Sequence, residues 1–208
     1  MAVSLTDLYE DFPELTVADV AWEKEIYAHF GLLYMGFALL EHSLINAATM
    51  KIAIDEAKRQ KIRKQEEWQS LHELAFAKAS SQTIGNLIKV VSKIREFSDL
   101  EGKFSEVKRV RDYFSHHFFR REAAHMSEKT AALLLLVDMR EARLLVDGAE
   151  VEAKLRYGAY TKRMGWPEME ESYIQVTSRE IRNAELSRLN SGTLPRGVDR
   201  WLNRGPEE

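Results

Sequence analysis

Cysteine is absent from this chain of 208 residues. Disulfide frameworks, thiolate nucleophiles and cysteine-ligated zinc or iron–sulfur sites are therefore excluded. Proline and glycine are scarce, with four and ten residues respectively, so there are few points at which a helix must end. The lack of cysteine is compatible with a reducing compartment. The scarcity of proline and glycine favours long helices.

Long apolar runs are also missing. The most apolar stretches, GLLYMGFALL and AALLLLV, are too short to span a bilayer and are followed closely by Glu41 and Asp138. The first residues, MAVSLTDLYEDFPELT, have no basic start and no apolar signal core. We therefore expect a soluble cytoplasmic protein that makes no membrane contact.

An excess of positive charge is lacking too, because 30 Lys and Arg residues face 33 Asp and Glu residues. Any nucleic-acid site must therefore rest on a local patch. Two basic patches occur: the run KRQKIRK at 58–64, and the stretch 101–121 with six basic residues against three acidic ones. Either run, taken alone, fits a solvated helix face better than an RNA contact.

What the chain does have is a high apolar content, 45% of its residues, with mostly helical spacing. This pattern predicts an all-α protein with an up-and-down helical bundle. Six helices are expected, at about 18–51 or beyond, 66–79, 83–97, 99–121, 127–165 and 167–190. Three patterns predict helix starts, namely Thr16 with Asp19, Ser98 with Glu101, and Ser127 alone.

We expect three parts along the chain. Residues 1–125 form the helical bundle, and residues 126–190 form a helical extension that packs on it. Residues 191–208 have turn residues, mixed charge and little apolar surface apart from Trp201, so they are expected to form a flexible tail.

The stretch RDYFSHHFFRR at 111–121 combines two adjacent histidines, four aromatic residues and three arginines. On a helical wheel, one apolar stripe must face the core, and it consists of Phe104, Val107, Val110, Phe114 and Phe118. His116 lies nearly opposite the centre of this stripe, so core packing does not explain it. Asp112 precedes His116 by four residues, and its carboxylate can hold one imidazole nitrogen and favour the protonated ring.

Arg111 and His116 are about 140° apart on an ideal helix, which is awkward for two groups that act on one phosphate. Either the helix deforms between them, or a second chain brings its own copy to the opposite side. The sequence alone leaves both explanations open.

The residues from Arg111 to His116 resemble the R-x4-6-H signature of HEPN domains, small helical bundles found among prokaryotic toxins and antiviral defence proteins. The residue after the arginine is polar, the residue two before the histidine is apolar, and Phe118 follows in an H-x-F pattern. The signature also falls on a late helix of an all-α bundle. The resemblance covers roughly residues 19–121.

The resemblance implies metal-independent RNA cleavage in a homodimer, with two signature helices facing each other. His116 would be the general acid or base, Arg111 would clamp the phosphate, and Asp112 would orient His116. Further RNA or phosphate contacts are expected from Arg109, Ser115, His117, Arg120 and Arg121. An antitoxin or another partner protein is expected, and no cofactor.

Glu41 interrupts a nearly all-apolar segment, so we expect it to be partly buried and to need a cation or hydrogen-bond donors. The HEPN resemblance suggests a polar or acidic residue on an early helix near the signature, which makes Arg111 the candidate partner. This pair can either fix helix register or join a catalytic site. Both roles stay open.

Two alternatives to catalysis are a non-catalytic module that binds nucleotide, RNA or a partner protein, and a purely structural scaffold. His117 can replace His116 in the signature, although it lies nearer the apolar stripe. The other histidines show no HExxH or similar ligand pair, so we expect no metal site. They are His29, His42, His72 and His125.

Overall fold

The structure is a computed structural model, and it describes residues 21–62, 64–165, 183 and 187. Within these residues the chain is helical and has no strand, which confirms the predicted all-α class. Residues Ala18–Pro167 make one compact unit, to which all the helices described below belong. The predicted Thr16 cap and the predicted tail at 191–208 lie outside the described residues, as does nearly all of the predicted helix 167–190.

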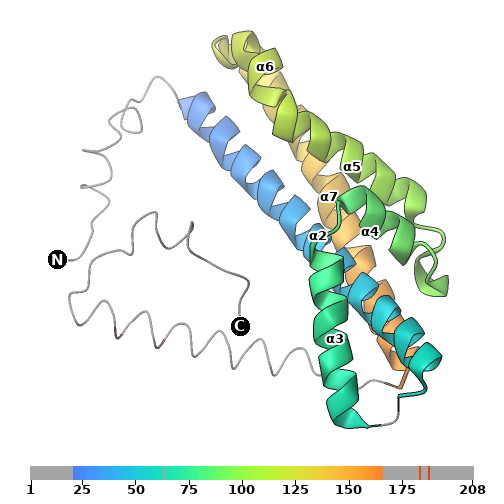
Figure 1. Cartoon of the computed structure of the whole chain (residues 1–208). Coiled ribbons are helices and arrows are strands. Elements are labelled where there is room, and N and C mark those ends of the chain that lie inside the picture. Colours follow the sequence, from blue (N-terminus) through green and yellow to red (C-terminus); the bar gives the residue numbers. More distant parts are fainter. Residues whose placement is uncertain (1–20, 63, 166–182, 184–186, 188–208) are drawn as a thin grey trace. The chain divides into compact units, whose positions relative to one another are not determined.

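The described elements follow one another in the order drawn in Figure 1. They are α2 (Ala21–Gln60), α3 (Gln65–Ser80), α4 (Ile84–Val91), the 3-10 helix η3 (Arg95–Phe97), α5 (Glu101–His116), α6 (Phe118–Met126) and α7 (Lys129–Arg163). The predicted helices at 18–51 or beyond and 66–79 correspond to α2 and α3. The one predicted at 127–165 corresponds to α7.

The two long helices, α2 and α7, run side by side in the same direction and share the most extensive contact in the unit (Figure 1). Their approach is close because α2 presents Gly36 to α7. A Cβ added at Gly36 would lie 3.0 Å from Cγ1 of Val146. Small buried residues line both helices, including Ala47, Ala48 and, on α7, Ala149. This α2–α7 seam forms the centre of the bundle.

The predicted division between bundle and extension differs from the structure. The proposed boundary at 125–126 falls inside the unit Ala18–Pro167. Residues that would belong to the extension, such as Met139, Val146 and Tyr160, are buried in the same core as α2. Helix α7 is therefore a central part of the bundle.

The helix predicted at 99–121 is two helices, because the chain bends at His117, with φ −128° and ψ −27°. Most of the predicted apolar stripe is buried, including Phe114 and Phe118. Beyond the bend, both Phe118 and Phe119 reach the ring of Phe30 on α2, at centroid distances of 5.5 and 4.7 Å. Both rings therefore belong to one aromatic cluster with Phe30.

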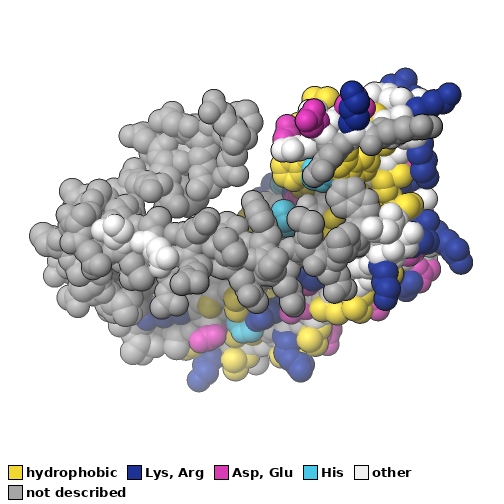
Figure 2. All heavy atoms as spheres, turned by 90° about the horizontal axis from the view of Figure 1, so that it is seen from below, with side chains coloured by type: hydrophobic (Ala, Val, Ile, Leu, Met, Phe, Trp, Pro, Cys, Tyr) yellow, Lys and Arg dark blue, Asp and Glu magenta, His cyan; other side chains and the backbone are white. Residues whose placement is uncertain are grey.

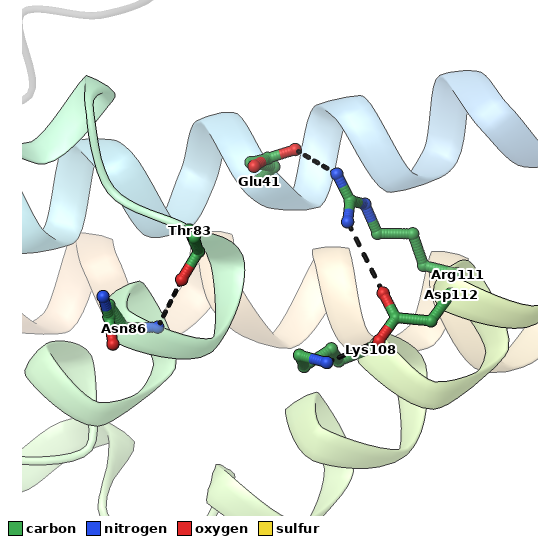
Figure 3. A network of polar contacts seen from close by, with 6 residues as sticks. All are labelled: Glu41, Thr83, Asn86, Lys108, Arg111 and Asp112. Atoms are coloured by element: carbon green, nitrogen blue, oxygen red, sulfur yellow. Dashed lines mark hydrogen bonds and ion pairs between the residues drawn. The ribbon is translucent and has the colours of Figure 1, made fainter. Parts of the chain in front are cut away.

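The segment predicted as one helix at 83–97 is α4, a turn and η3. Thr83 caps α4 by accepting a hydrogen bond from the backbone N–H of Asn86 at 3.4 Å (Figure 3). The helix is only eight residues long, since the chain leaves it at Ser92, whose hydroxyl donates to the carbonyl oxygen of Ile88.

Two predicted caps are wrong. The Ser98 hydroxyl donates to the carbonyl oxygen of Arg95 at 3.0 Å, and α5 begins after Leu100 without a side-chain cap. Ser127 lies one residue before the N-cap position of α7, so it does not cap this helix. The actual cap is Glu128, whose carboxylate accepts from two backbone N–H groups of the first turn. A carboxylate in this place also complements the helix dipole.

By length and composition, residues Trp22–Gln60 are apolar enough to cross a membrane, and only 33% of the most apolar window is buried. A core helix of a soluble protein passes the same test. One side of α2 is fully buried in the bundle through Ile26, Leu40 and Leu44, as expected of a core helix.

Candidate functional site

Arg111 on α5 is held between two carboxylates, one on α2 and one on its own helix (Figure 3). Its Nη2 lies 3.7 Å from Oε2 of Glu41, and its Nη1 lies 3.6 Å from Oδ1 of Asp112. The Arg111 and Glu41 side chains are 31% and 30% exposed. The predicted contact between Glu41 and Arg111 is therefore confirmed, as is the partial burial of Glu41.

Asp112 has a second partner that the sequence analysis did not consider. The ammonium group of Lys108, one turn earlier on α5, donates to Oδ2 of Asp112 at 2.5 Å. The interactions recorded for Asp112 within the described part of the chain are those with Lys108 and Arg111, in place of the predicted one with His116. Lysine is charged at neutral pH whereas imidazole is only partly so, which favours Lys108. The cluster of Glu41, Lys108, Arg111 and Asp112 has two charges of each sign.

His116 is the last residue of α5, and its side chain is exposed. Its ring meets that of His117 edge-on, with 6.3 Å between centroids. Ser115 is exposed as well. The imidazole of His116 is thus accessible to a ligand from solvent, as the wheel position predicts.

His117 occupies the bend and is half-buried. Nη2 of Arg120 lies 3.3 Å from its Nδ1. Because a guanidinium group only donates hydrogen bonds, Nδ1 must be the acceptor, and the proton of the neutral ring then sits on Nε2. His117 is therefore oriented by α6, whereas His116 has no such restraint among the described residues.

A second polar group crosses the bend and was missed by the sequence analysis. The Tyr113 hydroxyl donates to Oε1 of Glu122, and Oε2 of the same carboxylate lies 3.0 Å from Nδ1 of His125. Burial, together with the carboxylate of Glu122, raises the pKa of Tyr113 to about 12. The pairing of Glu122 with His125 could have been predicted from the sequence, because residues three apart on a helix are neighbours. The contact of Tyr113 with Glu122 could not, because it depends on the bend.

The remaining predicted contacts, Arg109, Arg120 and Arg121, all have exposed side chains. The guanidinium of Arg121 lies 6.0 Å from the centre of the Tyr113 ring. The two arginines of α6 follow the two histidines after two phenylalanines, and the contact of Arg120 with His117 places a guanidinium beside an imidazole at the bend. We call residues 111–125 the bend site.

The other basic run, at 58–64, lies where α2 ends. It borders a hollow of about 460 Å³, lined by Ile54, Ala57, Lys58, Lys61, Ile62, Trp68 and Met164. The walls are mainly apolar, and Arg59 is paired with Glu56 of its own helix. Among the side chains coloured in Figure 2, Lys and Arg lie beside acidic and apolar ones.

No group of three or more His, Asp and Glu side chains within the described ranges is arranged to hold a metal ion. Comparison of the chain with family models, curated proteins and solved structures gave no match. The likeness to the HEPN signature therefore rests on the residues of the bend site themselves.

Proposed function

We propose that this protein is a metal-independent endoribonuclease of the HEPN toxin or antiviral-defence type, acting as a homodimer in the cytoplasm. The observation that supports the proposal most is the exposed imidazole of His116, which ends α5 within a segment that also carries three arginines. An imidazole exchanges protons near neutral pH, and guanidinium groups bind phosphodiesters. These are the two groups that such a reaction needs.

In the proposed reaction, an imidazole removes the proton of a ribose 2′-hydroxyl. The 2′-oxygen then forms a bond to phosphorus, and the bond from phosphorus to the 5′-oxygen breaks. The leaving oxygen takes up a proton, which gives a 2′,3′-cyclic phosphate and a 5′-hydroxyl. His116 of one chain acts as the base or the acid, and the second chain's copy supplies the opposite role.

Arg111 would stabilise the charge on phosphorus-bound oxygens. Glu41 and Asp112 hold its guanidinium from two sides, which orients it before RNA binds. The role of Asp112 in this proposal is thus to position Arg111. Arg120 and Arg121, which are exposed, would attract the RNA backbone.

A second function, a non-catalytic module that binds nucleotide, RNA or a partner protein such as an antitoxin, is favoured by one observation. The charge of Arg111 is offset by two carboxylates, and Asp112 bonds to Lys108. An arginine held this way serves the packing of α5 on α2 equally well. The exposed basic residues of α6 would then bind without cleavage.

The two functions are separated by incubating the purified protein with mixed RNA, with and without EDTA, and determining the end groups of any fragments. A nuclease of the proposed type gives cyclic phosphate ends in both conditions. His116→Ala and Arg111→Ala should each abolish cleavage, with unchanged helicity and oligomeric state. His125→Ala is the matched control, because it removes an imidazole that is paired with Glu122.

Loss of cleavage on chelation would mean a metal-dependent reaction and would contradict the proposal. Intact RNA that nevertheless binds the protein would support the non-catalytic module. Cleavage that survives in the His116→Ala variant but not in His125→Ala would assign the chemistry to the imidazole held by Glu122.

A further inference from the structure

Helix α7 buries one face in the bundle and carries a line of large apolar side chains on the opposite face. Five large apolar side chains on the outer face are between 51% and 64% exposed. They are Leu133, Val137, Leu144, Val151 and Leu155, and we call them the α7 stripe. At 100° per residue all five lie within an arc of about 40°.

The α7 stripe is long as well as narrow. From its first to its last residue it extends about 33 Å along the helix axis. Single exposed apolar residues are ordinary on a protein surface, whereas five large ones aligned on one helix face indicate a surface that binds another apolar surface. The question is what covers it.

The order of the residues in the stripe identifies the partner. Val137 and Val151 lie seven residues before and after Leu144, and Leu133 and Leu155 lie eleven before and after it. The stripe therefore reads the same in both directions. A twofold axis through Leu144 and perpendicular to α7 would place each valine against a valine and each leucine against a leucine. Self-complementarity of this kind is what a twofold contact requires.

Charge supports the same arrangement. Arg140 and Asp147 lie on one flank of the stripe, about 40° and 60° from its centre. In an antiparallel twofold pair each flank meets its own copy, so Arg140 of one chain would lie beside Asp147 of the other, twice. Within the part of the chain that is described, Asp147 pairs with Arg143 at 3.5 Å and no ion pair involves Arg140, which is exposed.

We propose that a second copy of this chain packs on the α7 stripe, with the two α7 helices antiparallel and a twofold axis through Leu144. This contact differs from the one implied by the HEPN resemblance, in which two signature helices, here α5, face each other. It stands independently of RNA cleavage, because none of its residues belongs to the bend site.

The first test is the mass in solution, measured by light scattering. The chain of 24.0 kDa should have twice that mass through this contact alone, or a higher multiple if the α5 contact of the proposed nuclease forms as well. Leu144→Asp should raise the dissociation constant of the α7 contact by more than about 100-fold, because two carboxylates would meet on the axis, and should reduce the mass to half or less. Leu74→Asp, at a residue of α3 that is 69% exposed, is the control and should leave the dimer intact. Helicity by circular dichroism should stay the same in both variants.

The absence of cysteine permits a second test that reads the direction and register directly. Under mild oxidation, Leu144→Cys should form a disulfide dimer by itself. Val137→Cys alone should not, because its two copies would lie about 21 Å apart along the axis. A mixture of Val137→Cys and Val151→Cys should give a disulfide dimer that neither variant forms alone, and peptide mapping should show residue 137 joined to residue 151.

A monomeric wild-type protein, or an assembly whose mass is unaffected by Leu144→Asp, would overturn the proposal. Self-crosslinking of Val137→Cys would replace it with a parallel contact. If no cysteine variant forms a disulfide, the stripe is covered by another segment of the chain or by a different partner, and the proposal fails. Activity on RNA affects none of these readings.

Discussion

The α2–α7 seam and the bend site stabilise the same bundle by different means. The seam consists of small apolar residues at close distance, with Gly36 against Val146. The bend site has a packed aromatic underside and an exposed surface of ionisable groups. A tightly packed seam tolerates little change in volume, whereas half-exposed charges rearrange at small cost. Binding chemistry is therefore expected at the bend, and structural rigidity at the seam.

The largest effect should come from the aromatic underside of the bend. Phe118 is buried and stacks on Phe114 at 4.8 Å between centroids. Phe118→Ala should lower the free energy of unfolding by about 3–5 kcal/mol, because it leaves a cavity in the core. Urea unfolding followed by circular dichroism measures the loss.

The neighbouring Phe119 is 42% exposed although it contacts the same ring of Phe30. Phe119→Ala is thus a matched control and should cost about 1 kcal/mol, since less apolar area leaves the interior. Equal losses for the two variants would contradict the assignment of Phe118 to the core side of the bend.

The seam can be broken through its volume. Gly36→Leu should destabilise the protein by about 1–3 kcal/mol, because the new side chain has no room beside Val146. Gly31 is the control on the same helix, because a Cβ there has nothing within 4 Å. Gly31→Leu should stabilise by about 0.5–1 kcal/mol, since leucine favours the helix over glycine. A loss of stability of similar size at both positions would show that the lack of space at the seam is not the cause of the effect at Gly36.

The two regions also differ in how far they could be predicted from the sequence. Helix α7 follows from apolar spacing, because its buried face repeats regularly. The need of Glu41 for a cation follows from its place in an apolar segment, whereas Arg111 was chosen as the partner from the HEPN resemblance. Periodicity and charge balance are local signals, and they identify the helix and the need for a partner but not the partner itself.

The features that sequence reasoning missed depend on contacts between distant segments. No proline or glycine marks the bend at His117, and the ring of Phe30 that receives Phe118 belongs to α2. In a straight helix Tyr113 and Glu122 would lie on opposite sides, about 13.5 Å apart along the axis. For Asp112, two partners had helical spacing, Lys108 before it and His116 after it, and the sequence pattern alone does not rank them.

A smaller effect is expected from the ion pair that joins α5 to α2. A double-mutant cycle with Glu41→Gln and Arg111→Gln should give a coupling energy of about 0.5–1 kcal/mol, because both side chains are partly exposed. The coupling should fall as salt is added. The pair of Lys108 and Asp112, more exposed and within one helix, should give about 0.3–0.5 kcal/mol in the same measurement. A coupling energy well above 1 kcal/mol for Glu41 with Arg111 would mean that this ion pair stabilises the packing of α5 on α2 about as much as close packing stabilises the seam.

The smallest effect concerns Tyr113 and the pH. Its pKa is raised to about 12 in the folded protein, first by burial and then by Glu122. An unfolded chain has a tyrosine pKa of about 10, so the unfolded state loses this proton first. The stabilisation is fully present below about pH 10 and is lost as the pH rises towards 12.

Tyr113→Phe removes this titration and leaves the ring in place, so its free energy of unfolding should fall less than that of the wild type between pH 10 and 12. The difference should stay below about 1 kcal/mol, because solvent screens a half-buried group. Burial raises the pKa of Tyr160 on α7 to about 12 as well. The two proteins must therefore be compared at the same pH, because the contributions of Tyr160 and of the lysine side chains to the free energy of unfolding are then the same in both and cancel in the difference. If the two proteins lose stability in parallel over this range, the hydrogen bond from Tyr113 to Glu122 does not hold the bend, and the aromatic underside alone fixes the angle between α5 and α6.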